Sequence, residues 1–117
     1  MTDRNNTSII TIQEAVRDFR DARDWRQFHS PKNLSMSIAI EAAELMEHFQ
    51  WLTTAEAAAL AQENRVAREA IAEELADVLI YCFSLADVLE YDLAEIIFDK
   101  LVKNEQKYPV GEESDKV

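Results

Sequence analysis

Apolar residues recur along most of this chain at spacings of three, four and seven, which is the period of an α-helix with one buried face. Stretches of this kind run from about 11 to 24, 34 to 52, 66 to 89 and 93 to 107. The pattern therefore predicts an all-α protein. The positions that we expect to face inward are Ile12, Ala15, Val16 and Phe19, then Leu34, Ile38, Leu45, Phe49 and Leu52, then Ile71, Leu75, Val78, Leu79, Cys82, Leu85 and Leu89.

Polar residues mark the ends of these helices. A capping residue followed three positions later by an acid predicts three helix starts, at Thr11–Glu14, Thr53–Glu56 and Asp92–Glu95. The second of these begins a short Ala-rich connecting helix that runs to about residue 64. Pro109 and Gly111 are expected to end the last helix. On the first helix, we expect the arginines to lie on the wetter side: Arg17, Arg20 and Arg23.

Composition agrees with one helical domain spanning 1–117, in which we expect 1–8 and 111–117 to be flexible. The chain has one Gly and two Pro, which disfavours a turn-rich β protein. Its net charge of −11 makes nucleic acid a poor partner. The single Cys82 excludes an internal disulfide. No apolar run approaches the roughly 20 residues of a membrane span, and none resembles a signal peptide, so we expect a cytoplasmic protein without membrane contact.

Two acidic pairs stand out within the apolar stretches. Glu41 and Glu44 are three residues apart, and so are Glu74 and Asp77. Residues at this spacing share one helix face. Either pair alone is common on a solvated surface, but both pairs border apolar stripes, where unpaired charge is uncommon. Brought together, like charges at about 4 Å repel by roughly 4 kcal/mol at an effective dielectric of 20. The repeated pattern favours a shared divalent cation.

The donor types narrow the choice of metal. Di-iron helical proteins use Glu-x-x-His pairs, whereas His48 comes four residues after Glu44 and the second pair has no histidine near it. We interpret His48 as a surface residue. An all-carboxylate set suits Mg²⁺, with Mn²⁺ as a substitute, and Mg²⁺ often binds together with substrate phosphates. The chain lacks a Gly-rich phosphate loop, which excludes a P-loop mechanism.

Two further segments each have two interpretations. Trp25–Asn33 carries aromatic residues without helical periodicity, and it is either a loop folded over the core or a wall of a ligand pocket. The last helix ends in lysines, which complement the helix dipole. Alternatively, Lys103 or Lys107, with Asn104, reaches over the acidic site to an anionic ligand.

Four motifs in order then resemble one family. They are Asp24–Asn33, the acidic pair with its continuation Glu44–Trp51, the segment Glu73–Tyr81, and the closing Lys103–Pro109. Over roughly residues 10–110 the chain resembles the all-α MazG-like nucleoside triphosphate pyrophosphohydrolases, most closely their short dCTP pyrophosphatase branch. The family pattern Glu-Glu-x-x-Glu lacks its leading acid here, because Ile40 stands in that position. The second pattern, Glu-Glu-x-x-Asp, is complete at 73–77.

This resemblance implies a four-helix-bundle-type fold with a short connecting helix, assembled as a homotetramer built from two dimers. It implies Mg²⁺ binding by the four acids, Glu41, Glu44, Glu74 and Asp77, which carry the catalysis. It also implies a base and sugar pocket formed by Trp25, His29, Trp51 and Tyr81, with Asn104 and Lys107 on the triphosphate. The implied reaction is hydrolysis of a nucleoside triphosphate, dCTP or a modified dCTP, to the monophosphate and pyrophosphate, in nucleotide-pool cleansing.

Two rival functions follow from the same residues. One is a helical oligomer that binds nucleotide or metal without turnover. The other is a structural helical protein whose acids only solvate its surface. Mg²⁺-dependent nucleotide binding without product would favour the first, and a melting temperature indifferent to both ligands would favour the second.

Overall fold

The computed structural model describes residues 6–111, and all regular structure in that range is helical, which confirms the predicted all-α class. The elements are α1 (Ile9–Ala22), a short 3-10 helix η1 (Arg26–Phe28), α2 (Pro31–Glu47), α3 (Thr54–Glu63), α4 (Arg65–Val88) and α5 (Leu93–Lys107). Most of the two segments expected to be flexible, 1–5 and 112–117, lie outside the described residues.

The first two helices begin earlier in the chain than predicted. Ser8, not Thr11, caps α1, and its hydroxyl accepts a hydrogen bond from the Thr11 N–H. Ser30 caps α2 in the same way through the Asn33 N–H. Pro31 occupies the first turn of α2, where its missing N–H leaves no intrahelical bond unmade. Helix α2 therefore spans 31–47 instead of the predicted 34–52.

The later helices match the prediction closely. Thr53 and Glu56 form the expected capping box of α3, because each side chain accepts a hydrogen bond from the other residue's backbone N–H. Asp92 caps α5 by accepting from the Glu95 N–H. The connecting helix and the last helix therefore begin where the sequence placed them.

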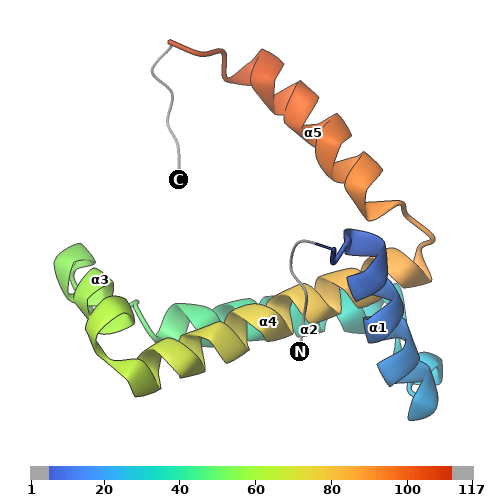
Figure 1. Ribbon diagram of the computed structural model, residues 1–117, viewed down its shortest axis with the longest axis horizontal. Coiled ribbons are helices and arrows are strands. Elements are labelled where there is room, and N and C mark those ends of the chain that lie inside the picture. Colours follow the sequence, from blue (N-terminus) through green and yellow to red (C-terminus); the bar gives the residue numbers. More distant parts are fainter. Residues whose placement is uncertain (1–5, 112–117) are drawn as a thin grey trace.

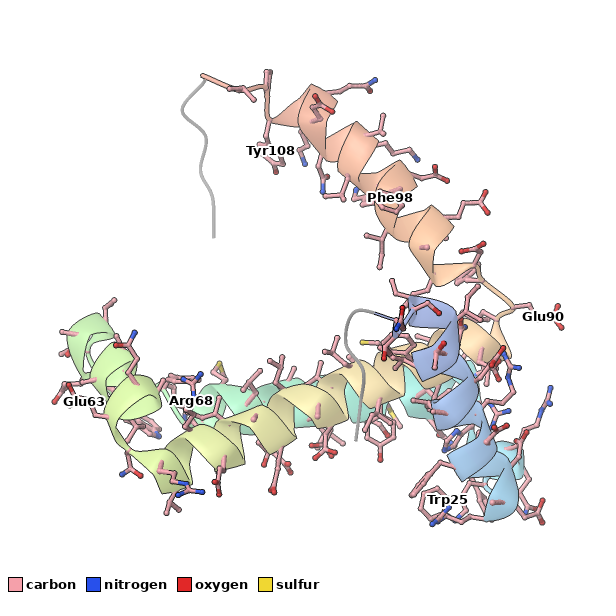
Figure 2. The ribbon with its side chains drawn as sticks, in the orientation of Figure 1. Trp25, Glu63, Arg68, Glu90, Phe98 and Tyr108 are labelled. Atoms are coloured by element: carbon pink, nitrogen blue, oxygen red, sulfur yellow. The ribbon has the colours of Figure 1, made fainter. Side chains whose placement is uncertain are left out.

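Helices α2 and α4 lie side by side and run in opposite directions, with α3 joining them at one end (Figure 1). Helix α1 packs against α4 near the other end. Helix α5 follows a sharp turn and extends away from the α2–α4 pair (Figure 1). Figure 2 shows Phe98 in the middle of α5 and Tyr108 at its end, both distant from that pair.

Much of the predicted apolar stripe is exposed on the single chain. Leu34 is buried as expected, but Phe19 is 51% exposed and Leu75 is 49% exposed. The accessible surface is 9525 Å², whereas a compact monomer of 13.4 kDa exposes about 6,500 Å². The radius of gyration is 17.0 Å, against about 13 Å for a compact domain of this length. A single chain therefore leaves much of the apolar surface of its helices exposed to solvent.

A buried ion pair fixes α1 to α4. Arg20, expected on the wetter side, is only 2% exposed, because Asp87 of α4 provides a counter-charge. The Arg20 Nη1 donates to Asp87 Oδ2 at 2.8 Å, and the Arg17 Nε donates to Asp87 Oδ1 at 2.8 Å. Burial by itself raises the pKa of Asp87, but the hydrogen bonds from Arg17 and Arg20 outweigh it and hold that pKa below its ordinary value. The carboxylate therefore stays charged.

We expect Asp87→Ala to lower the free energy of unfolding by about 3 kcal/mol, because it leaves the buried Arg20 charge with only the half-exposed Asp21 as its counter-charge. Urea denaturation at a fixed protein concentration measures the change. The matched control is Glu69→Ala, which removes an exposed ion pair with Arg65 and is expected to cost under about 1 kcal/mol. Equal losses in the two variants would show that the Arg20–Asp87 pair does not anchor α1.

Candidate metal centre and adjoining pocket

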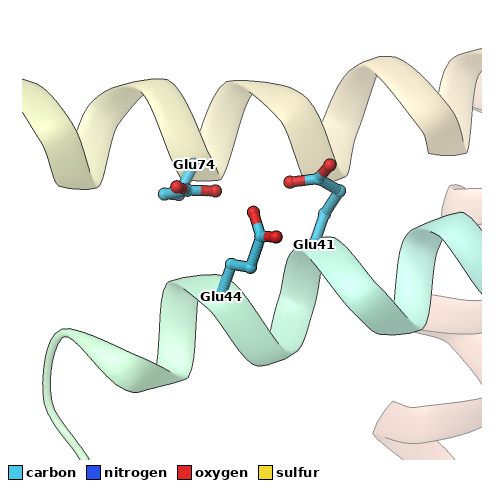
Figure 3. Close-up of side chains that lie close together, drawn as sticks. All are labelled: Glu41, Glu44 and Glu74. Atoms are coloured by element: carbon cyan, nitrogen blue, oxygen red, sulfur yellow. The ribbon is translucent and has the colours of Figure 1, made fainter.

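Three carboxylates meet between α2 and α4. Glu41 and Glu44 project from α2 toward Glu74 of α4 (Figure 3). One oxygen from each of the three lies within 4.8 Å of the others. The three-residue spacing of the first pair puts both acids on the α2 face that packs against α4. The sequence prediction that the two acidic segments approach each other therefore holds for these three residues.

The carboxylates of this group repel one another. Partial burial, followed by a hydrogen bond to Glu44 and the charges of Glu44, Asp77 and Glu74, raises the pKa of Glu41 to about 7. Burial and then the charge of Glu44 also raise the pKa of Glu74 above its ordinary value. Without a cation, the three groups resist ionising together.

The donor set fits a hard divalent cation. The buried Oε2 atoms of Glu41 and Glu74 have no hydrogen-bond partner, and an unpaired buried carboxylate oxygen is costly. A cation held by oxygen ligands satisfies both atoms and removes the repulsion. Among residues 6–111, the acidic, histidine and cysteine side chains whose ligand atoms lie close enough to share a metal ion are those of Glu41, Glu44 and Glu74.

Asp77, predicted as the fourth ligand, is not among the residues whose carboxylate oxygens lie within 4.8 Å of one another. Its charge still raises the pKa of both Glu41 and Glu74. Asp77 also lines a neighbouring pocket of about 310 Å³. The other lining residues that bear on ligand binding are Phe19, Arg20, Trp25, His29 and Tyr81. Asp77 therefore lies between the three-carboxylate group and the pocket.

The turn after α1 shapes this pocket. Asp24 adopts a left-handed backbone conformation with φ of 56°, and the next N–H, of Trp25, donates back to the Arg20 carbonyl at 3.1 Å. The Trp25 ring then meets Phe19 edge-on, with centroids 5.7 Å apart. Burial, and then the positive charge of Arg20, lower the pKa of His29. Trp25 and His29, two residues of the segment 25–33, thus line the pocket, which favours the second of the segment's two interpretations.

Three predicted substrate residues lie elsewhere on the chain. Trp51 is 84% exposed and does not line the pocket. Asn104 and Lys107 lie on α5, which runs away from α2 and α4 (Figure 1). The Lys107 ammonium instead lies over the Tyr108 ring, 5.3 Å from its centroid. Within one chain, therefore, these residues do not meet the acids.

Sequence reasoning missed Arg20 and Phe19 as pocket residues. The available signal was Asp87, an acid inside an apolar stretch that needs a partner. The repeat of Arg17 and Arg20 three residues apart supplied two candidate partners. Neither the position of Asp87 nor the spacing of the two arginines predicts that Arg20 lines a pocket.

Among residues 6–111, no helix combines the length and the apolarity that crossing a bilayer requires.

Fold and site together define an all-helical protein with a carboxylate centre suited to a divalent cation. Residues 36–116 match the model of the MazG-like family, and the chain belongs to that family.

Its relatives include two curated proteins and one solved structure. The chain is 43% identical to dCTP pyrophosphatase 1 of Rattus norvegicus over 103 residues, which are 88% of this chain and 60% of that protein. The Homo sapiens protein of the same name is 41% identical over 102 residues, 87% of this chain and 59% of that protein. The chain thus spans about 60% of the length of these relatives. A crystal structure of a pyrophosphatase from Archaeoglobus fulgidus is 43% identical with a TM-score of 0.75, covering 84% of this chain and 89% of that one.

The raised pKa of Glu41 gives an expected pH dependence. Because its folded-state pKa of about 7 exceeds the ordinary value of 4.5, the stability from this group is fully present below about pH 4.5 and is lost as the pH rises through about 7. We expect the metal-free melting temperature to fall between about pH 5 and pH 8, and Mg²⁺ to raise it more at the higher pH.

Glu41→Gln is expected to flatten that pH dependence and to reduce the Mg²⁺ shift. The control is Glu73→Gln, which removes the same charge from an exposed position outside the group. Scanning calorimetry with and without Mg²⁺ measures both effects. A wild-type shift unchanged by Glu41→Gln would mean that Mg²⁺ binds elsewhere.

Proposed function

We propose that this chain is a Mg²⁺-dependent nucleoside triphosphate pyrophosphohydrolase. Its substrate is dCTP or a modified dCTP, and its products are the monophosphate and pyrophosphate, in nucleotide-pool cleansing. The observation that carries the proposal is the position of Asp77 between the three-carboxylate group and the aromatic pocket. The similarity to proteins named as dCTP pyrophosphatases and as a pyrophosphatase supports it.

The acids have defined parts in this reaction. Glu41, Glu44 and Glu74 hold Mg²⁺, with Asp77 beside them. When bound, the ion neutralises polyphosphate charge and supplies Lewis acidity to the reacting oxygens. Glu41 accepts the proton of the attacking water, since its half-buried carboxylate has an oxygen without a partner. The water oxygen bonds to the α or the β phosphorus, the bridging P–O bond between these two atoms breaks, and the products are the monophosphate and pyrophosphate.

The pocket holds the nucleoside. Trp25 and Tyr81 offer aromatic faces on which a base stacks, a contact worth about 1–3 kcal/mol per base. His29 has a buried Nδ1 without a hydrogen-bond partner among the described residues, which suits a polar contact with base or sugar. Asp77 lies at the pocket edge, so a nucleoside seated there directs its phosphates toward the metal centre.

A second copy of the chain completes this site. The single chain exposes about 3,000 Å² more surface than a compact monomer of its mass, enough for an interface of standard size or larger. The exposed apolar residues of α5 include Phe98, at 68% exposure. In the homotetramer that we propose, built from two dimers, α5 packs on a neighbouring subunit and brings Asn104 and Lys107 to that subunit's triphosphate. Trp51 joins the pocket in the same way.

We expect the protein with Mg²⁺ to release pyrophosphate from dCTP, and Glu74→Gln to reduce kcat at least about 100-fold, because the metal loses a ligand. Glu73→Gln, one residue away and outside the group, is expected to keep the wild-type rate. A panel of nucleoside triphosphates, assayed separately for pyrophosphate and orthophosphate, measures this. Orthophosphate as the main product would indicate another reaction, and nucleotide binding without either product would indicate a binding module.

Assembly has its own test. Phe98→Glu is expected to shift the protein from tetramer to smaller species and to lower activity, because a charge enters the interface. Val110→Glu makes the same change at a residue that is 98% exposed, beyond the end of α5, and is expected to leave assembly intact. Light scattering at micromolar concentration reports the mass. A wild-type monomer with full activity would contradict completion of the site by a second copy.

A further inference from the structure

Arg20 holds an unusual position for a charged residue. It is 2% exposed, yet it lines the 310 Å³ pocket together with Trp25, His29 and Tyr81. Two of its three nitrogens are engaged: Nη1 donates to Asp87 Oδ2 at 2.8 Å, and Nε donates to Asp21 Oδ1 at 3.0 Å. The guanidinium plane is therefore held firmly, with two fixed anchor points.

The third nitrogen is not satisfied. Nη2 lies 3.0 Å from the same Asp21 oxygen, but it makes no hydrogen bond. This nitrogen carries two hydrogens, so one shared oxygen leaves at least one N–H without an acceptor. A buried donor without a partner costs about 1–3 kcal/mol. His29 Nδ1, on the wall of the same pocket, is also buried and unpaired.

The charge balance indicates what this N–H binds. Arg20 is paired with Asp87 and Asp21, and Arg17 shares Asp87, so two positive and two negative charges cancel locally. A phosphate would gain little from such a group. A neutral acceptor on the edge of a planar base gains a hydrogen bond from a donor that is already fixed in place.

We propose that Arg20 determines base specificity by donating its free Nη2–H to a ring carbonyl or ring nitrogen acceptor of the bound base, such as O2 or N3 of cytosine. This inference rests on the proposed function and adds to it a residue outside the acidic and aromatic motifs. Asp87 and Asp21 hold the guanidinium in place, and His29 offers a second polar contact to the same base. Lysine cannot replace Arg20 here, because one ammonium does not span both carboxylates and the base.

The test uses the full-length protein with Mg²⁺ and two substrates. One is dCTP, and the other is a deoxyribose triphosphate that carries a phenyl ring in place of the base, which stacks but offers no acceptor. We expect Arg20→Lys to lower kcat/KM for dCTP by about tenfold or more, mainly through KM, as for a lost charge-assisted hydrogen bond. With the phenyl compound the same substitution is expected to change kcat/KM by less than about twofold.

The matched control is Arg17→Lys. Arg17 binds the same Asp87 carboxylate but does not line this pocket, so both substrates are expected to keep their wild-type kcat/KM. Equal losses on the two substrates in Arg20→Lys would assign Arg20 a purely structural role and overturn the proposal. No loss on either substrate would overturn it as well.

Two further outcomes keep the proposal separate from the function beneath it. If the wild type releases no pyrophosphate from dCTP, the proposed function fails. The role of Arg20 is then tested by calorimetry, which compares how much Arg20→Lys weakens the binding of dCTP and of the phenyl compound. If Arg20→Lys does not fold, as judged by circular dichroism, the wild type alone decides. A preference for dCTP over the phenyl compound of about tenfold supports the proposal, and equal affinity overturns it.

Discussion

Mutual repulsion of carboxylates across the α2–α4 contact is the constraint on which the rest of this molecule depends. Glu41 and Glu44 face Glu74 across the two helices, although two helices pack best through apolar side chains. The raised pKa values of Glu41 and Glu74 record this conflict. A divalent cation would resolve it, and the ion that we propose for catalysis would also allow the two central helices to pack with their acids charged.

A second set of charges is satisfied within the chain and gives the pocket its shape. Arg20 and Arg17 bind Asp87, which holds α1 against α4 and places the turn with Trp25 and His29 beside Asp77. Residues of α1 and of the turn after it thus form one wall of the pocket. Helix α5 instead extends away from the α2–α4 pair (Figure 1). The exposed apolar residues on α1, α4 and α5 would be buried by the second copy that we propose.

The sequence contained most of the local information. Caps such as Asp92 and the three-residue spacing of the acids depend on neighbours in the chain, so α3, α4, α5 and the meeting of three acids were predictable. The burial of Arg20 was not, because its partner Asp87 lies 67 residues away. Sequence spacing placed Asp77 on the same helix face as Glu74, but only the packing of the helices brings it to the edge of the pocket. Trp51, Asn104 and Lys107 depend on surfaces that one chain does not bring together.

Anomalous scattering from crystals grown with Mn²⁺, which replaces Mg²⁺ and scatters anomalously, shows directly whether the three acids hold a divalent cation. The expected result is a peak in contact with carboxylate oxygens of Glu41, Glu44 and Glu74, at the edge of the pocket that Asp77 borders. A well-ordered crystal in which these acids turn away from one another into solvent, with no peak between α2 and α4, would contradict the account.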